Sequence, residues 1–165
     1  MDAVIGLGSN LGDRLRFLRS AATELMHVGR ICSRSAVYET DPVGGPPQPR
    51  YLNAALWLVT ELLPDALLAV LQRIEHHAGR HRDGERNQPR TLDLDMLLLG
   101  SRGELVMVTH DLVVPHPRLH QRAFALRPVL DLEPTLVHPA LGVPLSDLLA
   151  CLPSEDIQTQ PIGWL

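Results

Sequence analysis

The chain has 165 residues, enough for one domain with a substantial core, and we expect residues 1–165 to form a single domain. An apolar content of 45%, with no signal pattern and no apolar run of about 18 residues, predicts a cytoplasmic protein without membrane contact. The net charge of −4 disfavours nucleic-acid binding, and because all 15 basic residues are Arg, the lysine-dependent P-loop, protein-kinase and Schiff-base sites are excluded.

A short buried strand is predicted over residues 3–7, and glycines separate it from a helix that Asp13 can cap. The apolar face of this helix comprises Leu15, Leu18, Ala22, Leu25 and Met26. A strand, glycines and a helix start could form a dinucleotide-binding turn. The spacing, however, is GxGxxxG, and no strong second β-α-β unit follows. We therefore expect the glycines to let Ser9 and Asn10 turn the chain tightly.

The next segments are predicted to be a strand, a long loop, a strand and a helix. Residues 31–39 alternate polar and apolar side chains and predict a strand. Residues 41–51 hold four prolines and two glycines, and a loop this long in a compact domain is usually functional. Residues 53–59 predict a strand buried on both faces. Pro64 then opens a helix that ends at Gly79 and buries Leu67, Leu71, Ile74 and Ala78.

Residues 79–95, GRHRDGERNQPRTLDLD, are the most informative stretch. They begin with a loop that carries four arginines, Arg80, Arg82, Arg86 and Arg90. A strand over residues 91–99 follows, and because side chains alternate along a strand, Asp93 and Asp95 project from one face. Two carboxylates about 7 Å apart repel each other unless a cation such as a divalent metal lies between them. Since arginines suit a polyphosphate, the stretch predicts a magnesium–nucleotide site. The alternative is a strand with two solvated aspartates beside a basic surface loop.

After a turn, residues 105–108 are predicted to pair back on the aspartate strand as a hairpin. Pro115 and Pro117 are expected to hold His116 in an extended, exposed segment. His116 and His120 lie four residues apart, but Pro117 disfavours a regular helix there. No third ligand with zinc spacing is present, so we do not expect a zinc site.

Two helices are predicted near the end of the chain, over residues 120–132 and 144–152, and the tail after Pro153 is expected to be loosely held. Cys32 and Cys151 form no CxxC pair and are expected to be reduced core residues. The element order, β-α-β-β-α-β-β-α, predicts the α+β class, with a mostly antiparallel sheet and helices packed on it. Its core order, β-α-β-β-α-β, is ferredoxin-like.

Four motifs stand out along the chain: GSNLGDR, YETDPVG…QPRYLNA, RIE…GR…R…PRTLDLD and VPHPR…RAF. Together, from about Ile5 to Pro134, they resemble the 6-hydroxymethyl-7,8-dihydropterin pyrophosphokinase family of the folate pathway. PRTLDLD and VPHP-x₄-RAF are highly specific for it. The resemblance implies ATP and 6-hydroxymethyl-7,8-dihydropterin as substrates, AMP as a product, two Mg²⁺ ions and a ferredoxin-like fold. We expect the protein to act as a monomer.

The resemblance also implies a role for each matching residue. The implied metal ligands are Asp93 and Asp95. The implied pterin contacts are the ring faces of Tyr51 and Phe124, the amide of Asn53 and the backbone around Thr40 and Val43. The implied ATP contacts are Gln72, Glu75, Arg80, Arg82, Arg86, Arg90, Met96, His116 and Arg122. Arg82, Arg90 and Asp95 are the implied catalytic residues, with Asp95 acting as a proton acceptor or as a ligand only.

Two positions depart from the family pattern. Asn87 stands where the family usually has Trp, so the arginine loop lacks an aromatic lid. Asp111 stands near the place of a family arginine that precedes the VPH segment.

Two other functions stay open from the residues themselves. The first is a two-metal phosphohydrolase that uses Asp93 and Asp95 on a nucleotide or nucleic acid, although no further carboxylates lie beside the pair in the sequence. The second is a non-catalytic, ferredoxin-like regulatory module that binds a small ligand.

Overall fold

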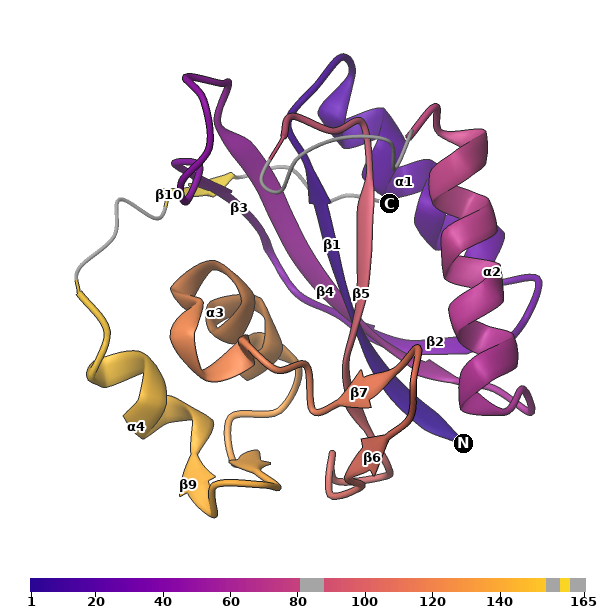
Figure 1. Cartoon of the computed structure of the whole chain (residues 1–165), viewed down its shortest axis with the longest axis vertical. Coiled ribbons are helices and arrows are strands. Elements are labelled where there is room, and N and C mark those ends of the chain that lie inside the picture. The colour runs from indigo at the N-terminus through magenta and orange to yellow at the C-terminus, as the bar shows by residue number, and fades with distance from the viewer. Residues whose placement is uncertain (81–87, 154–157, 161–165) are drawn as a thin grey trace.

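The computed structural model describes residues 1–80, 88–153 and 158–160 (Figure 1). Within these residues the main sheet has six strands, all paired antiparallel, in the order β10-β3-β4-β1-β5, with β2 also paired to β4. The strands of this sheet are β1 (Asp2–Ser9), β2 (Arg30–Arg34), β3 (Val37–Thr40), β4 (Tyr51–Val59), β5 (Asp93–Leu99) and β10 (Gln158–Gln160). The predicted α+β class and mostly antiparallel sheet are confirmed.

Helices cover both faces of this sheet. They are α1 (Arg14–Leu25), α2 (Pro64–His77), α3 (Ala123–Leu132), α4 (Leu145–Ala150) and the 3₁₀ helix η1 (Leu119–Gln121). Figure 1 shows α1 and α2 on one side of the sheet, and α3 and α4 on the other. Two small hairpins complete the described fold: β6 (Met107–Val108) with β7 (Val113–Val114), and β8 (Val137–His138) with β9 (Val143–Pro144).

Each face of the sheet has its own apolar core, because the strands alternate their side chains. The larger core joins Ile5 and Leu7 of β1 to Leu18 of α1 and Leu71 of α2. The smaller core joins other sheet residues, among them Leu97, to α3 and α4. Each fully buried leucine contributes about 1.5–3 kcal/mol of burial free energy, so both helix layers hold the sheet firmly.

The sequence signals at the helix starts agree with the structure. The carboxylate of Asp13 caps α1 by accepting a hydrogen bond from the backbone N–H of Arg16 at 3.1 Å. Pro64 is the first residue of α2, and its apolar stripe of Leu67, Leu71 and Ile74 is buried.

Three of the predicted elements differ from the structure. The single strand predicted over residues 31–39 is divided into β2 and β3 at Ser35. The Ser35 backbone N–H donates to the Ala55 carbonyl oxygen of β4, and the Ser35 hydroxyl accepts the Ala55 N–H. In the segment at residues 105–108, the Leu105 N–H bonds to β5, at the Leu99 carbonyl oxygen (3.0 Å), while Met107 and Val108 pair with β7. The helix predicted from His120 begins at Ala123 and follows η1, and the one predicted over 144–152 spans only α4.

The two cysteines are free, as predicted, but Cys32 and Cys151 are both exposed, so their placement in the core was wrong. In the tail, residues 158–160 add β10 to the edge of the sheet beside β3, which the expectation of a loosely held tail did not include. Among the described residues, none of the helices is both long and apolar enough to cross a membrane.

Candidate active site

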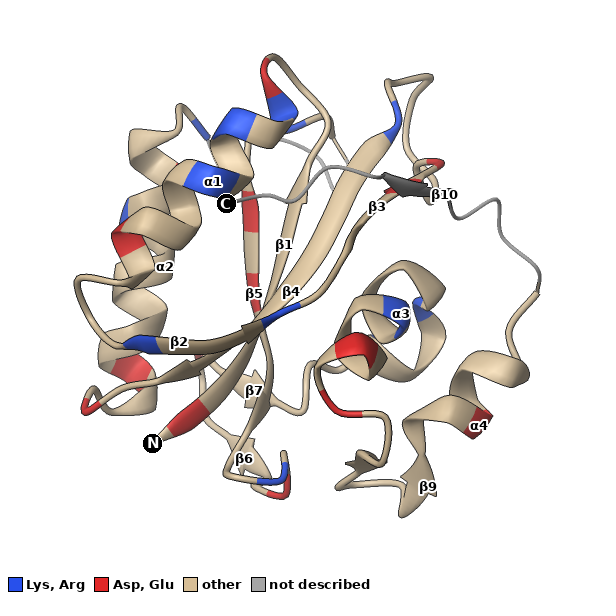
Figure 2. Cartoon of the chain, turned by 180° about the vertical axis from the view of Figure 1, so that it is seen from behind, with Lys and Arg blue, Asp and Glu red and all other residues tan. Residues whose placement is uncertain are grey.

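A pocket of about 820 Å³ lies on the α3 side of the sheet, over the neighbouring strands β4, β1 and β5. Three residues of each strand line it, and the register brings them together: Gly8 is paired with Asn53 on one side and with Asp93 on the other. In Figure 2 the two acidic positions of β5 stand beside uncharged stretches of β1 and β4. The prediction that Asp93 and Asp95 share one face of a strand is therefore confirmed, and that face opens into a pocket.

The glycines of β1 form the floor of this pocket, so the expectation that they only serve a turn was incomplete. A Cβ at Gly8 would lie 3.3 Å from Asn53 Oδ1, and a Cβ at Gly6 would lie 3.0 Å from Leu97 Cδ1. A side chain at either position would fill the pocket or push its walls apart. Of the three glycines Gly6, Gly8 and Gly12, it is Gly12 that has the positive φ, 66°, that a tight turn can require.

Arginine side chains lie beside both carboxylates. Asp93 forms ion pairs with Arg80 and, at 2.8 Å, with Arg90. Asp95 faces Arg122 at 3.6 Å and the His116 ring nitrogen Nε2 at 4.0 Å. Burial, and next the negative charge of Asp93, raises the pKa of Asp95 to about 6, against the opposing effect of Arg122. Asp95 therefore gains from any further cation that stabilises its ionised form.

The carboxylate pair fits magnesium that arrives with a phosphate ligand. Mg²⁺ usually keeps water molecules and binds through one or two carboxylates plus substrate phosphates. No cluster of three or more potential metal-ligating side chains occurs among the residues that the structure describes. A magnesium ion that keeps water molecules and binds substrate phosphates needs only one or two protein carboxylates.

His116 lies beside β5 because its backbone N–H donates to the carbonyl oxygen of Leu97 at 2.9 Å. Its side chain is only 17% exposed, so the expectation of an exposed histidine was wrong. Burial, followed by the charges of Arg122 and Arg118, lowers its pKa to about 4, so the ring is neutral at pH 7. Since Nδ1 accepts the backbone N–H of Arg118 at 3.1 Å, the ring proton is assigned to Nε2, which faces Asp95.

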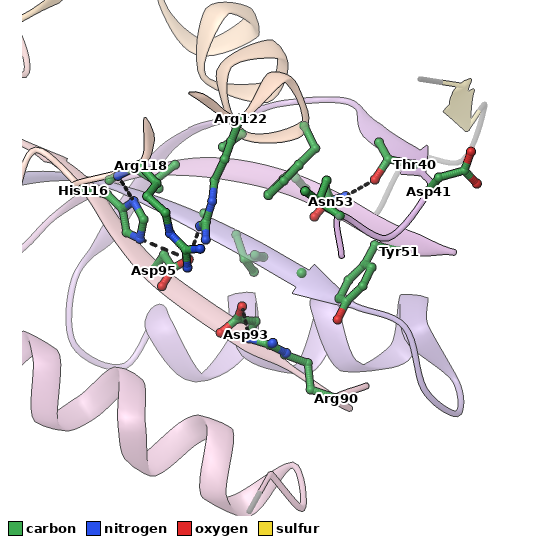
Figure 3. A pocket seen from close by; sticks show the side chains of 18 of the residues that line it. Thr40, Asp41, Tyr51, Asn53, Arg90, Asp93, Asp95, His116, Arg118 and Arg122 are labelled. Carbon is green, nitrogen blue, oxygen red and sulfur yellow. Dashed lines mark hydrogen bonds and ion pairs between the residues drawn. The ribbon is translucent and has the colours of Figure 1, made fainter. Parts of the chain in front are cut away.

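The other end of the pocket is aromatic and polar (Figure 3). The amide nitrogen of Asn53 donates to the hydroxyl of Thr40 at 2.8 Å, and both residues are buried. Tyr51 lines the pocket from the start of β4, and burial raises the pKa of its phenol. Phe124 lines it from α3, with the guanidinium carbon of Arg122 5.5 Å from its ring centroid. Val43 also lines the pocket, from the proline-rich loop.

Three residues with an implied ATP contact do not line the pocket that the described residues form: Gln72, Glu75 and Met96. Gln72 is exposed on α2, and the side chain of Met96 is buried in the larger core. Glu75 is buried, forms an ion pair with Arg80, and accepts the backbone N–H of Leu94 at 2.8 Å. Glu75 thereby orients Arg80 towards Asp93. Arg82, Arg86 and the departure at Asn87 lie outside the described residues.

Asn10 is a site residue to which the sequence assigned no role beyond a turn. Asn10 is 1% exposed. Its backbone N–H donates to the Arg90 carbonyl oxygen at 3.1 Å, and its side-chain Oδ1 accepts the backbone N–H of Arg90 at 2.8 Å. Its amide nitrogen donates to Gln48 Oε1 at 2.8 Å and to the Pro49 carbonyl oxygen at 3.1 Å. Asn10 therefore joins the end of the arginine loop to the proline-rich loop.

The comparisons with known proteins agree on one family. The family model described as 7,8-dihydro-6-hydroxymethylpterin-pyrophosphokinase (HPPK) matches residues 4–134. A protein of Pseudomonas aeruginosa named 2-amino-4-hydroxy-6-hydroxymethyldihydropteridine pyrophosphokinase is 42% identical over 159 residues, 95% of each chain. The protein of that name in Bacillus subtilis is 43% identical over 132 residues, 79% of this chain and 77% of its own.

Other relatives are longer. The mitochondrial folate synthesis bifunctional protein of Arabidopsis thaliana is 47% identical over 133 residues, which are 79% of this chain but only 23% of the relative. A solved structure of Plasmodium falciparum HPPK-DHPS shares the fold, with a TM-score of 0.69 at 14% identity over 90% of this chain and 44% of that one. The chain thus spans about a quarter of the bifunctional plant relatives and nearly all of the pseudomonal one. By its sequence and its fold, the chain belongs to the 7,8-dihydro-6-hydroxymethylpterin-pyrophosphokinase family.

Proposed function

We propose that this protein transfers pyrophosphate from Mg-ATP to the hydroxymethyl group of 6-hydroxymethyl-7,8-dihydropterin, giving AMP and the pterin pyrophosphate for folate synthesis. The observation that carries the proposal is the joining of two kinds of surface in one pocket. The pocket is lined by the rings of Tyr51 and Phe124 and the amide of Asn53, and also by two carboxylates that pair with arginines. A flat heterocycle and a metal-bound polyphosphate would thus lie next to each other.

The aromatic end supplies what a pterin needs. Two ring faces bury both sides of a planar ligand, and such aromatic contacts are worth about 0.5–1.5 kcal/mol beyond the buried area. Asn53 already donates to Thr40 and so holds its amide in one orientation at the pocket edge. The backbone near Thr40 and Val43 supplies the remaining polar contacts in this proposal. The hydroxymethyl group of the bound pterin would then point along β5 towards the carboxylates.

The acidic end would hold magnesium, and we propose two ions, with Asp93 and Asp95 as their protein ligands. Bound magnesium would neutralise phosphate charge and polarise the attacked phosphorus. In the structure, Asp93 is satisfied by Arg80 and Arg90. Once Asp93 turns to a metal ion, Arg90 and the part of the Arg80 guanidinium that is not held by Glu75 can donate to phosphate oxygens instead. Ligand binding therefore exchanges ion-pair partners rather than leaving any charge buried alone.

Catalysis by these residues rests on positioning and on charge. Arg90, together with Arg82 of the loop outside the described residues, would donate to the transferred group as its charge grows in the transition state. The Nε2–H of His116 and the guanidinium of Arg122 flank Asp95 and would fix the phosphates for in-line attack. Asp95, the carboxylate whose pKa is raised to about 6, would accept the proton of the hydroxymethyl group.

The remaining assignments belong to the same proposal. Arg80 and Arg86 would bind phosphate, and Gln72, Glu75 and the backbone at Met96 would contact the nucleoside part of ATP. We propose a single pyrophosphokinase domain, acting as a cytoplasmic monomer.

The test is a product analysis. The protein is incubated with Mg-ATP, with and without 6-hydroxymethyl-7,8-dihydropterin, and nucleotides and pterins are separated by chromatography. We expect AMP to form only when the pterin is present, one-for-one with the pterin pyrophosphate. ADP as the product would overturn pyrophosphoryl transfer, and AMP formed without acceptor would favour a phosphohydrolase. Binding without any turnover would favour a regulatory module.

A further inference from the structure

Arg118 lines the pocket but has no role in the proposed reaction. Its side chain is exposed and lines the pocket. The other pocket arginines of the described chain each face a carboxylate: Arg80 and Arg90 face Asp93, and Arg122 faces Asp95. Arg118 has no ion pair with any carboxylate in the described ranges 1–80, 88–153 and 158–160.

The backbone of Arg118 is held firmly although its side chain is exposed. Its N–H donates to His116 Nδ1 at 3.1 Å, and the residue precedes η1 directly. The next residue, Leu119, is fully buried in the smaller core, and its N–H donates to the carbonyl oxygen of His116 at 2.9 Å. Arg118 therefore projects from a fixed point, so its guanidinium can reach only a limited part of the pocket.

That part of the pocket is the phosphate end. Figure 3 shows Arg118 beside His116 and Arg122 near Asp95, at the opposite end from Tyr51. The charges of Arg118 and Arg122 repel each other, and Arg118 contributes to lowering the pKa of Arg122. Asp95 is the carboxylate that faces this group at present. If Asp95 turns to a metal ion, the two arginines need another anion.

Asp111 does not supply the charge that a family arginine would bring near that position. Its side chain is 78% exposed, it pairs with His110 at 2.7 Å, and it does not line the pocket. An acidic residue thus stands at position 111, away from the pocket, while an arginine without a carboxylate partner in the described chain stands at position 118, in the pocket.

We propose that Arg118 is a further nucleotide-binding residue of this site and donates hydrogen bonds to a phosphate oxygen of ATP. The proposal rests on the proposed function, because it assumes that a nucleoside triphosphate occupies this end of the pocket. Because the Arg118 guanidinium has no ion pair that must break before it binds phosphate, we expect it to contact the phosphates equally in the ground state and in the transition state. Such uniform binding lowers KM without raising kcat.

The test compares Arg118→Gln and Arg118→Lys with wild type by calorimetric titration. The probe is Mg²⁺ with the α,β-methylene analogue of ATP, whose bond at the transfer position cannot break, and adenosine is titrated separately. Arg102→Gln is the matched control, because Arg102 is also exposed but does not line the pocket. Thermal unfolding of each variant establishes that it is folded, which the exposure of both side chains favours.

We expect Arg118→Gln to weaken the analogue about tenfold, the loss of one charge-assisted contact, while adenosine binding and kcat stay unchanged. Arg118→Lys should keep part of the affinity, and Arg102→Gln all of it. Equal affinities of wild type and Arg118→Gln for the analogue would overturn the proposal, as would equal losses for the analogue and adenosine.

Failure of the proposed function looks different in the same experiments. Wild type that binds the analogue but makes no AMP from ATP and pterin would overturn the function and leave the comparison at Arg118 intact. Wild type that makes AMP while Arg118→Gln binds and turns over normally would overturn only the role of Arg118.

Discussion

At the scale of single residues, the site depends on a small number of ion pairs that must change partners. Asp93 is bound by two arginines in the absence of ligand, and Asp95 faces Arg122 and the Nε2–H of His116. These contacts orient both carboxylates within the pocket. Burial and the negative charge of Asp93 raise the pKa of Asp95 to about 6, so a further cation beside Asp95 would stabilise its ionised form.

Asp95→Asn is expected to remain folded and to lose turnover about a thousandfold or more, because a charged metal ligand and proton acceptor is removed from the reacting centre. Steady-state AMP formation checks the rate, and thermal unfolding checks the fold. Asp41→Asn is the matched control: Asp41 also lines the pocket, but it is an exposed partner of Arg50, at 3.0 Å. A folded Asp95→Asn protein with near wild-type turnover would refute the assignment.

Tyr51→Ala and Phe124→Ala should each weaken pterin binding by about 1–3 kcal/mol and leave ATP binding nearly unchanged. The reason is that both rings line the pocket, and that Tyr51 lies at the end away from Arg118 and His116. Titration of the pterin and of the ATP analogue into each variant measures the two affinities separately. Tyr38→Phe serves as the control, since Tyr38 is buried in β3 and bonds to Asp131 at 2.7 Å outside the pocket. Equal losses for both ligands would mean that the rings are structural.

At the scale of elements, the regular parts of the fold could be predicted because their patterns are local. The apolar stripe of α2 and the alternation of β5 each fix one element without reference to the rest of the chain. The break between β2 and β3 could not be found this way, since Ser35 leaves the strand to bond Ala55 of β4, twenty residues on. The pairing of Met107 and Val108 with β7 is local, but two residues are too few for side-chain alternation to identify the partner strand.

The site was predicted in the same uneven way. Asp93 and Asp95 followed from strand alternation alone, whereas Tyr51, Phe124 and His116 followed only from the resemblance to a family. The floor of the pocket depends on register, because Gly8 lies between Asn53 and Asp93 only once β1 is paired on both sides. A glycine in a strand carries no local sign of what approaches it.

Asn10→Ala tests the link between two loops of the site. The change removes three side-chain hydrogen bonds at a buried position and leaves the backbone N–H of Arg90 without its side-chain acceptor, while the backbone bond from Asn10 N–H to the Arg90 carbonyl oxygen is kept. We expect a loss of about 1–3 kcal/mol in the free energy of unfolding, measured with urea, and faster amide exchange at Arg90. Gln72→Ala, on the exposed face of α2, should change stability by less than about 0.5 kcal/mol. Unchanged exchange at Arg90 would show that Asn10 does not hold the loop.

At the scale of the whole molecule, the α3 side of the sheet carries both the pocket and the smaller core. The pocket wall at Phe124 belongs to α3, which packs on β4 and on α4. Any loss of packing in the C-terminal third of the chain should therefore reach the aromatic end of the site. His138, in β8, is the ionisable residue to examine there, since it is only 4% exposed.

His138 links the stability of the whole molecule to pH. Neither of its ring nitrogens has a hydrogen-bond partner in the part of the chain that the structure describes, and its ring meets that of His120 edge-on, with centroids 5.8 Å apart. Burial, and next the charge of His120, lowers the pKa of His138 in the folded protein. The unfolded chain therefore binds this proton more tightly, and folding stability must fall as protons are added.

The lowered pKa of His138 sets the direction in which folding stability changes with pH. The contribution of His138 is fully present above the unfolded histidine pKa of about 6.5 and is lost as the pH falls below that value towards the lowered pKa of the folded state, by up to about 1.4 kcal/mol per pH unit. His138→Leu removes the titrating group from a buried position, so urea unfolding at pH 7.5, 6.5 and 5.5 should show a shallower decline than in wild type. His110→Leu is the control, because His110 is 96% exposed and should leave the decline unchanged. Parallel declines in wild type and His138→Leu would mean that other groups cause the acid sensitivity, and that the buried ring is accommodated in its charged form.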